Sequence, residues 1–275
     1  MTRTIVITGA ASGIGLALVD RILRSRSDIR LIGVDLVDCP EPLVESLRCD
    51  LSDLEAIAAL QLPEHVDGLA NVAGVPGTAP AETVLAVNTL GVRAVTGRVL
   101  ELMASGASIV NVSSIAAHRN TLPQNLIDSL LAVTDTEGLR HWLGQNPLDG
   151  PAAYDTSKRA LTDWTVELSA AVQTRGIRVN SVSPGPTQTP ILADFETSMG
   201  SEAISRSAHA VGRHGTAAES AAAVEFLLSP SASWINGIDI PVEGGLTALR
   251  TAASRPPVVE PHLPPTSSTR KGVLR

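Results

Sequence analysis

Short, almost continuously apolar runs alternate with helical patterns along the first half of this chain, and this alternation limits the folds open to it. The runs lie at Thr4–Thr8, Ile29–Val34, Gly68–Val72 and Ser108–Ser113. Strands that are apolar at successive positions are covered on both faces of a sheet. The helical stretches between the runs are Gly13–Arg26, Leu51–Gln61 and Thr83–Ser105. Strand–helix–strand repetition predicts right-handed crossovers and a parallel sheet.

The second half continues the same pattern. It adds a helix over Ala152–Thr174, a strand at Arg178–Val182, a helix over Ala217–Leu228 and a last strand at Ile238–Val242. We therefore predict an α/β fold with a doubly wound parallel sheet, of the Rossmann type. A single domain is expected to span residues 1–249.

Two segments depart from this rhythm. Residues 119–150 fill a place where a short loop is usual. Within them, Thr134 and Glu137 have capping-box spacing ahead of an apolar stretch, which predicts that this insertion carries its own helices. Residues 250–275 contain five prolines and five basic residues against one acidic residue. We interpret this tail as disordered or wrapped along the surface.

Composition excludes several classes of protein. A hydrophobic content of 44% is too high for a disordered chain, yet no stretch reaches the ~18–20 apolar residues of a membrane span. The net charge of −7 argues against a nucleic-acid partner. The two cysteines are too few for a four-thiolate zinc site, and the histidines lack metal-ligand spacing. With no leader-like start, we expect a cytoplasmic protein without a metal.

A glycine-rich turn follows the first apolar run and opens the first helical stretch. It has the sequence Thr8-Gly9-Ala10-Ala11-Ser12-Gly13-Ile14-Gly15. At such a junction, backbone N–H groups and the helix N-terminus can approach a pyrophosphate closely. Asp35 lies 20 positions after Gly15, where a carboxylate accepts hydrogen bonds from the adenosine ribose and repels a 2′-phosphate. We predict NAD rather than NADP; the alternative is a tight turn and an unrelated surface aspartate.

The only tyrosine, Tyr154, precedes Lys158 by four positions near the start of a helical pattern. This spacing places the phenol and the ammonium group on one helix face. A phenol with a pKa near ~10 is a poor base at neutral pH unless a nearby cation stabilises its phenolate. Lys158 can supply that cation, although such pairs are also common as purely structural features.

The run ending in Val112-Ser113-Ser114 places two hydroxyls at the carboxyl edge of the sheet, where such folds bind ligands. With these residues the chain resembles the short-chain dehydrogenase/reductase family, from Thr4 to about Leu246. The motifs that carry the resemblance are the glycine turn, Asp50-Leu51, Asn71-Val72-Ala73-Gly74, Asn88, the two serines, Tyr154 with Lys158, and Pro184-Gly185-Pro186-Thr187 through Thr189.

The resemblance implies a role for each matching residue. Ser114 would bond to the substrate oxygen, and Tyr154 would be the acid/base. Lys158 would lower the pKa of that tyrosine, and Asn88 would anchor a water for proton relay. Ser113 is better explained as a strand-end hydroxyl bonded to backbone. The cofactor-binding residues expected are Gly9, Ser12, Gly13, Ile14, Gly15, Asp35, Asp50, Leu51, Asn71, Ala73, Gly74, Tyr154, Lys158, Pro184, Gly185, Thr187 and Thr189.

Within the family, 40 positions separate Ser114 from Tyr154, a wider spacing than most members have. This feature resembles the bacterial 3α-hydroxysteroid dehydrogenase/carbonyl reductases. We expect an oxidoreductase that interconverts a secondary alcohol and a ketone on an apolar, steroid-like substrate. The alternatives are a dehydrogenase of small cyclic alcohols or diols and a non-catalytic NAD-binding sensor or scaffold. The expected substrate contacts are Ile191, Leu192, Phe195 and Met199, which are equally suited to packing their own loop.

Assembly can be predicted from the same elements. The family's tetramers pair the helices that here would cover Thr83–Ser105 and Ala152–Thr174. Residues 119–150 directly precede the second helix, so we expect them to obstruct that contact. The prediction is a homodimer joined through Ala217–Val242, against the alternative of a cap that packs only on its own subunit.

Overall fold

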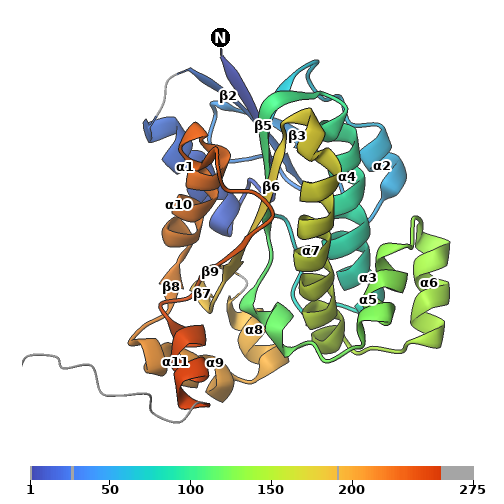
Figure 1. Cartoon of the computed structure of the whole chain (residues 1–275), viewed down its shortest axis with the longest axis vertical. Coiled ribbons are helices and arrows are strands. Elements are labelled where there is room, and N and C mark those ends of the chain that lie inside the picture. The colour runs from blue at the N-terminus through green and yellow to red at the C-terminus, as the bar shows by residue number, and fades with distance from the viewer. Residues whose placement is uncertain (1, 26–27, 191, 255–275) are drawn as a thin grey trace, which may run out of the picture.

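A seven-stranded parallel sheet forms the centre of the molecule in the computed structural model, with helices on both faces (Figure 1). The structure describes residues 2–25, 28–190 and 192–254. The strand order is β3-β2-β1-β4-β5-β6-β9. The order reverses between β1 and β4, and the carboxyl ends of strands at such a reversal form the ligand crevice of doubly wound folds. The predicted fold class is confirmed.

The bounds of the elements follow the alternation in the sequence. The strands are β1 (Arg3–Thr8), β2 (Ile29–Asp35), β3 (Val44–Arg48), β4 (Val66–Asn71), β5 (Met103–Val112), β6 (Arg178–Pro184), β7 (Thr187–Gln188), β8 (Gly215–Thr216) and β9 (Asp239–Val242). The α-helices are α1 (Gly13–Ser25), α2 (Leu54–Ala58), α3 (Ala81–Leu85), α4 (Val92–Leu100), α5 (Gln124–Leu131), α6 (Thr136–Gln145), α7 (Gly150–Val172), α8 (Leu192–Met199), α9 (Ser201–Val211), α10 (Ala217–Leu228) and α11 (Leu246–Ala253). A π-helical segment, η1 (Ala86–Gly91), joins α3 to α4, and shorter 3₁₀ turns lie at η2 (Ile115–Arg119), η3 (Gln173–Arg175) and η4 (Pro230–Ala232).

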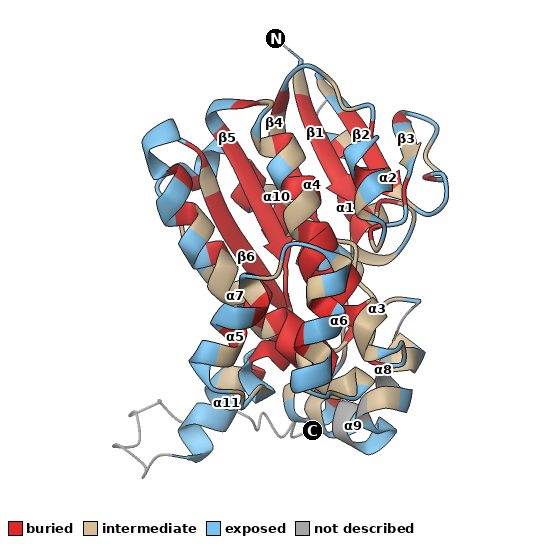
Figure 2. Ribbon diagram, turned by 90° about the vertical axis from the view of Figure 1, so that its right-hand side faces the viewer, coloured by how far each residue is buried: buried red, intermediate tan, exposed pale blue. Residues whose placement is uncertain are grey.

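Aliphatic side chains cover both faces of the sheet. Helices α1 and α10 pack on one face, and α2, α4 and α7 pack on the other. The central strands are buried along most of their length, which explains why their sequences are continuously apolar (Figure 2). Among the described residues, no helix is long and apolar enough to cross a membrane.

Two expectations about the sheet were wrong. The edge strand β3 was not predicted, because its sequence is short and polar and only Val44 among its residues is buried. The helix expected to reach Ser105 ends at Leu100, and β5 begins at Met103. Met103 pairs with Val66 of β4, and the Arg175 guanidinium binds the carbonyls of Leu100 and Met103. These long-range contacts override the helix propensity of the intervening residues.

The insertion contains two helices, α5 and α6, as predicted. Its capping residue is Asp135 rather than Thr134, since the Asp135 carboxylate accepts the Gly138 N–H at 2.7 Å. The inner faces of both helices join a third apolar cluster with α3, η1 and α7. The tail also differs from expectation, because α11 continues to Ala253. Residues 255–275 of the predicted tail lie outside the described residues.

Candidate active site

The glycine turn between β1 and α1 forms one wall of a cavity at the carboxyl edge of the sheet. Gly9 and Gly13 have positive φ angles of 71° and 53°. A Cβ atom on Gly15 would lie 2.0 Å from the Gly9 carbonyl oxygen, and one on Gly9 would lie 2.8 Å from the Ala73 backbone. Any side chain at either position would disrupt the turn. Ser12, Gly13 and Ile14 also line the cavity.

Asp35 lies at the end of β2 and faces the glycine turn. Its carboxylate accepts the backbone N–H of Ala11 at 3.0 Å and that of Leu36 at 2.7 Å. Asp50 and Leu51 line the same end of the cavity, after β3. This end therefore presents carboxylates and backbone rather than basic side chains, which favours a ribose with unmodified hydroxyls over one bearing a phosphate.

The cavity lining includes Ala73 and Gly74 but does not include Asn71. The Asn71 side chain is buried, and its Nδ2 donates to Thr96 Oγ1 at 2.9 Å and to Asn111 Oδ1 at 2.8 Å. Successive strand residues point to opposite faces, so a motif position at a strand end does not reveal which face its side chain takes. Asn71 joins β4 to β5 and α4 beneath the cavity.

Asn88 lies in the π-helical segment and is fully buried. Its amide holds the Val75 peptide from both sides: Oδ1 accepts the Val75 N–H at 2.9 Å, and Nδ2 donates to the Val75 carbonyl at 3.0 Å. A Cβ atom on Gly74 would lie 3.1 Å from Asn88 Oδ1 and 3.4 Å from Lys158 Nζ. Asn88 thus lies behind the cavity wall, close to Lys158. Short π-helical segments occur often at functional sites.

Helix α7 places Tyr154 and Lys158 one turn apart on its buried face. Lys158 Nζ donates to the Val112 carbonyl at 3.0 Å and lies 5.7 Å from the centre of the Tyr154 ring. Ser114 follows β5 and forms a hydrogen bond with Tyr154. The structure therefore brings Ser114, Tyr154 and Lys158 together at one edge of the cavity.

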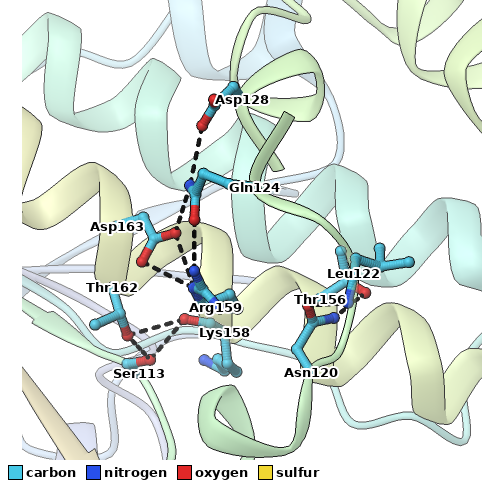
Figure 3. A network of polar contacts seen from close by, with 10 residues as sticks. All are labelled: Ser113, Asn120, Leu122, Gln124, Asp128, Thr156, Lys158, Arg159, Thr162 and Asp163. Atoms are coloured by element: carbon cyan, nitrogen blue, oxygen red, sulfur yellow. Dashed lines mark hydrogen bonds and ion pairs between the residues drawn. The ribbon is translucent and has the colours of Figure 1, made fainter. Parts of the chain in front are cut away.

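Ser113 has a different environment from its neighbour. Its hydroxyl donates to the Lys158 carbonyl at 2.9 Å and contacts Thr162 Oγ1 at 2.8 Å (Figure 3). The interpretation of Ser113 as a backbone-bonded strand-end hydroxyl is confirmed, because its hydrogen-bonding capacity is used within the protein.

Burial shifts the pKa values of both ionisable groups toward their neutral forms. It raises the pKa of Tyr154 to about 12, although the hydrogen bond with Ser114 and the charge of Arg119 oppose the rise. Burial also lowers the pKa of Lys158 to about 8. Each charged form is therefore costly alone, and the two charges stabilise one another when they form together.

A cavity of about 290 Å³ connects the glycine turn and Asp35 to the Tyr154 region. Pro184, Gly185, Thr187 and Thr189 form its far wall, and a Cβ atom on Gly13 would lie 3.7 Å from the Thr189 methyl carbon. Leu192 lines the cavity as expected, whereas Ile191 and the side chains of Phe195 and Met199 lie outside the described part of the chain. Arg119, Ser207 and Arg250 also line the cavity, and none of them was predicted to do so.

Comparisons with known proteins identify the family. Residues 3–125 match the short chain dehydrogenase model, and residues 140–247 match the enoyl-(acyl carrier protein) reductase model. The chain is 41% identical over 249 residues to coniferyl-alcohol dehydrogenase from Pseudomonas sp. (strain HR199 / DSM 7063), an alignment that covers 90% of this chain and 97% of that protein. The chain belongs to the short-chain dehydrogenase/reductase family. It is an oxidoreductase of that family.

Two further proteins are similar over a comparable share of this chain, at lower identity. The 3-alpha-hydroxysteroid dehydrogenase/carbonyl reductase of Comamonas testosteroni is 29% identical over 252 residues, covering 89% of this chain and 96% of that protein. The crystal structure of 3-alpha-hydroxysteroid dehydrogenase from Pseudomonas sp. B-0831 complexed with NADH has a TM-score of 0.79 and 32% identity, and covers 92% of this chain and 100% of that chain. The predicted family is confirmed.

Proposed function

We propose that this chain is an NAD-dependent dehydrogenase that interconverts an alcohol and its carbonyl product on an apolar, ring-bearing substrate. One observation carries the proposal: a single cavity joins the glycine turn and Asp35 to Ser114, Tyr154 and Lys158. The glycine positions fit a dinucleotide, because the tight turn that only glycines permit places backbone N–H groups and the N-terminus of α1 at the cavity, where a pyrophosphate can approach them. The similar structure that contains NADH supports the choice of cofactor.

The residues on the chain have distinct tasks in this mechanism. The glycine turn would hold the pyrophosphate, and Asp35 would accept hydrogen bonds from the adenosine ribose. When bound, the nicotinamide ring supplies the hydride acceptor. Ser114 and Tyr154 orient the substrate hydroxyl, and Tyr154 takes its proton as the carbonyl forms. The nearby Lys158 ammonium stabilises the phenolate form of Tyr154 that accepts this proton, and buried Asn88 fixes the loop beside Lys158.

Apolar residues dominate the cavity wall near Tyr154. They include Ile115, Pro186, Pro190 and Leu192. This lining supports a hydrophobic substrate, and the relatives named for hydroxysteroids suggest a secondary alcohol on a steroid-like ring system. A second candidate is an aryl-substituted alcohol, because the relative named for coniferyl alcohol has the higher identity of 41%.

A substrate screen tests this function against the alternative of a non-catalytic NAD-binding sensor. Hydroxysteroids, aryl alcohols and small cyclic alcohols and diols would each be offered with NAD⁺ at equal concentration, and NADH formation would be followed by absorbance. We expect turnover of the apolar ring-bearing members. Tight NADH binding by calorimetry without turnover of any compound would favour the sensor. Turnover of the small cyclic alcohols and diols alone would favour a dehydrogenase of those compounds.

Cofactor preference provides the first prediction. We expect NAD⁺ to be used at least ~10²-fold more efficiently than NADP⁺, because the Asp35 carboxylate would repel the 2′-phosphate. The variant Asp35→Ser should reduce this preference by about tenfold or more. Asp38→Asn is a matched control, since Asp38 is an exposed carboxylate already paired with Arg48. Comparable kcat/KM values for both cofactors in the wild type would contradict the assignment.

Assembly provides the second prediction, a dimer joined through α10 and β9. Strand β9 is an edge of the sheet, and three exposed apolar residues lie in this part of the chain: Phe226, Ile238 and Trp234, which is 99% exposed. The insertion packs beside α7, where we expect it to prevent a tetramer contact.

Light scattering should give the mass of two chains, and Trp234→Glu should give the mass of one. Val166→Glu, an exposed apolar site on α7, is the control. A tetramer would refute the blocking role of the insertion.

A further inference from the structure

The charged residues that line the cavity are divided by sign. Asp35 and Asp50 follow β2 and β3, on one side of the point where the strand order reverses. Arg119, Lys158 and Arg250 belong to η2, α7 and α11, on the side of the reacting groups. The half of the cavity assigned to the substrate is therefore apolar with positive side chains, an environment that attracts anions.

Two of these cations already have partners in the protein. The Arg119 guanidinium binds both oxygens of Asp155, with Nε–Oδ2 and Nη2–Oδ1 distances of 3.0 and 2.5 Å. In this two-point pair each oxygen of the carboxylate accepts a hydrogen bond from Arg119, and the negative charge of Asp155 compensates the positive charge of Arg119. Lys158 Nζ donates to the Val112 carbonyl and is assigned to Tyr154 in the mechanism.

Arg250 differs from the other two. Its Nη2 is 3.3 Å from Ser207 Oγ on α9, and within the described part of the chain no carboxylate lies at salt-bridge distance from it. Arg250 is exposed at the rim of the cavity, so its guanidinium has donors available for a ligand. A guanidinium only donates, and its preferred partners are oxyanions.

Helix α11 holds Arg250 in a defined place. Leu246 anchors the helix in the interior, and the Thr247 N–H donates to the Glu243 carboxylate at 2.7 Å. Glu243 in turn packs against Gly185 of the cavity wall, where a Cβ atom on the glycine would lie 2.9 Å from the Glu243 Cβ. The family model that matches this half of the chain ends at residue 247, before Arg250.

We propose that Arg250 is a specificity-determining residue that selects alcohols carrying an anionic oxygen group, such as a carboxylate, at the end remote from the reacting carbon. The apolar wall would accommodate the carbon skeleton while Arg250, at the rim, binds the anion. This inference rests on the proposed function for the position of the reacting carbon. The inference specifies a charged group at one end of the substrate, whereas the cavity lining alone indicates only that the substrate is apolar.

Matched acids and methyl esters test the proposal, because esterification removes the charge and keeps the skeleton. The probes are 4-carboxycinnamyl alcohol and lithocholate, each paired with its methyl ester. Binding to the complex with NADH is measured by calorimetry, and kcat/KM is measured with NAD⁺. For at least one skeleton we expect the acid to be preferred by about fivefold to tenfold, with the preference decreasing as salt is added. In Arg250→Met the preference should disappear, and Arg250→Lys should retain part of it.

Arg206→Met is the control, because Arg206 is a highly exposed arginine on α9 that pairs with Glu202 and does not line the cavity. It should keep the wild-type preference. An equal acid-to-ester ratio in the wild type and in Arg250→Met would overturn the proposal. The proposal would also be overturned if Arg250→Met bound NADH more weakly to the same degree whichever probe was present, since Arg250 would then bind the cofactor. Failure of the proposed function appears separately, as binding of both acid and ester without turnover.

Discussion

Replacing Tyr154 with phenylalanine is expected to reduce kcat by at least ~10²-fold while the affinity for NADH changes little. The substitution keeps the ring, which packs in the same apolar cluster as the insertion, and removes only the phenolic hydroxyl. Tyr154 is the only tyrosine in the chain, so no second phenol can take its place. Steady-state kinetics with the best substrate from the screen, together with calorimetry of NADH binding, provides the measurement.

Ser114→Ala is a useful companion to this variant. It removes the hydroxyl that bonds to Tyr154 and that we propose contacts the substrate oxygen, but it leaves the proposed proton-transfer group in place. We therefore expect a smaller loss than that of Tyr154→Phe. Retention of more than about a hundredth of the wild-type rate by Tyr154→Phe would be incompatible with the acid/base assignment.

Lys158→Met is expected to lower kcat by ~10²-fold or more and to weaken NADH binding, yet to stabilise the folded protein at pH 7. The loss of rate follows from removal of the cation that stabilises the phenolate. The gain in stability follows from the pKa of Lys158, which burial lowers to about 8 from the 10.5 of a free lysine. At neutral pH, holding this lysine protonated in the interior costs on the order of 3 kcal/mol. Loss of the bond to the Val112 carbonyl offsets about 1 kcal/mol of the gain.

The pH dependence of stability distinguishes this cause from general repacking. Below pH 8 the lysine is protonated in the folded and unfolded states, and the full cost of burying the charge is present. Between pH 8 and 10.5 the folded protein releases the proton while the unfolded chain retains it, so wild-type stability rises relative to the variant. Thermal unfolding without cofactor at pH 7 and pH 9.5 should show the variant's advantage shrinking. A variant less stable than the wild type at pH 7 would contradict the argument.

The sequence was most informative where a residue's environment is determined locally. Continuous apolar runs identified the central strands because both faces of this sheet are covered. Gly15 was identified because only a residue without a Cβ can lie against the Gly9 carbonyl. Tyr154 and Lys158 were identified because their spacing equals one helical turn. In each case, short-range geometry alone limits which residue type can be present.

Prediction failed where distant segments decide the outcome. The orientation of Asn71 depends on Thr96 and Asn111, which lie 25 and 40 positions away. The start of β5 depends on Arg175 and on pairing with Val66. Arg119 follows Ser114 by five positions, and this short spacing is only a weak indication that Arg119 lines the cavity. Nothing in the sequence indicated that Arg250 lines the cavity, because the proline-rich composition of the tail did not predict the last turn of α11.

The way the insertion is attached has a consequence for how this protein can evolve. Where the insertion begins, Arg119 binds Asp155 of α7. Asn120 bonds to Thr156 of the same helix, and further along Gln124 bonds to Asp163 (Figure 3). Where it ends, Gly150 lies so close to Gly77 that a Cβ atom would be 2.2 Å from the Gly77 carbonyl oxygen. Both ends of the insertion are thus held by contacts that do not depend on the number of residues between them. Natural selection can therefore lengthen or shorten α5 and α6, or change their outward-facing residues, without displacing Tyr154, provided that their inner faces stay apolar.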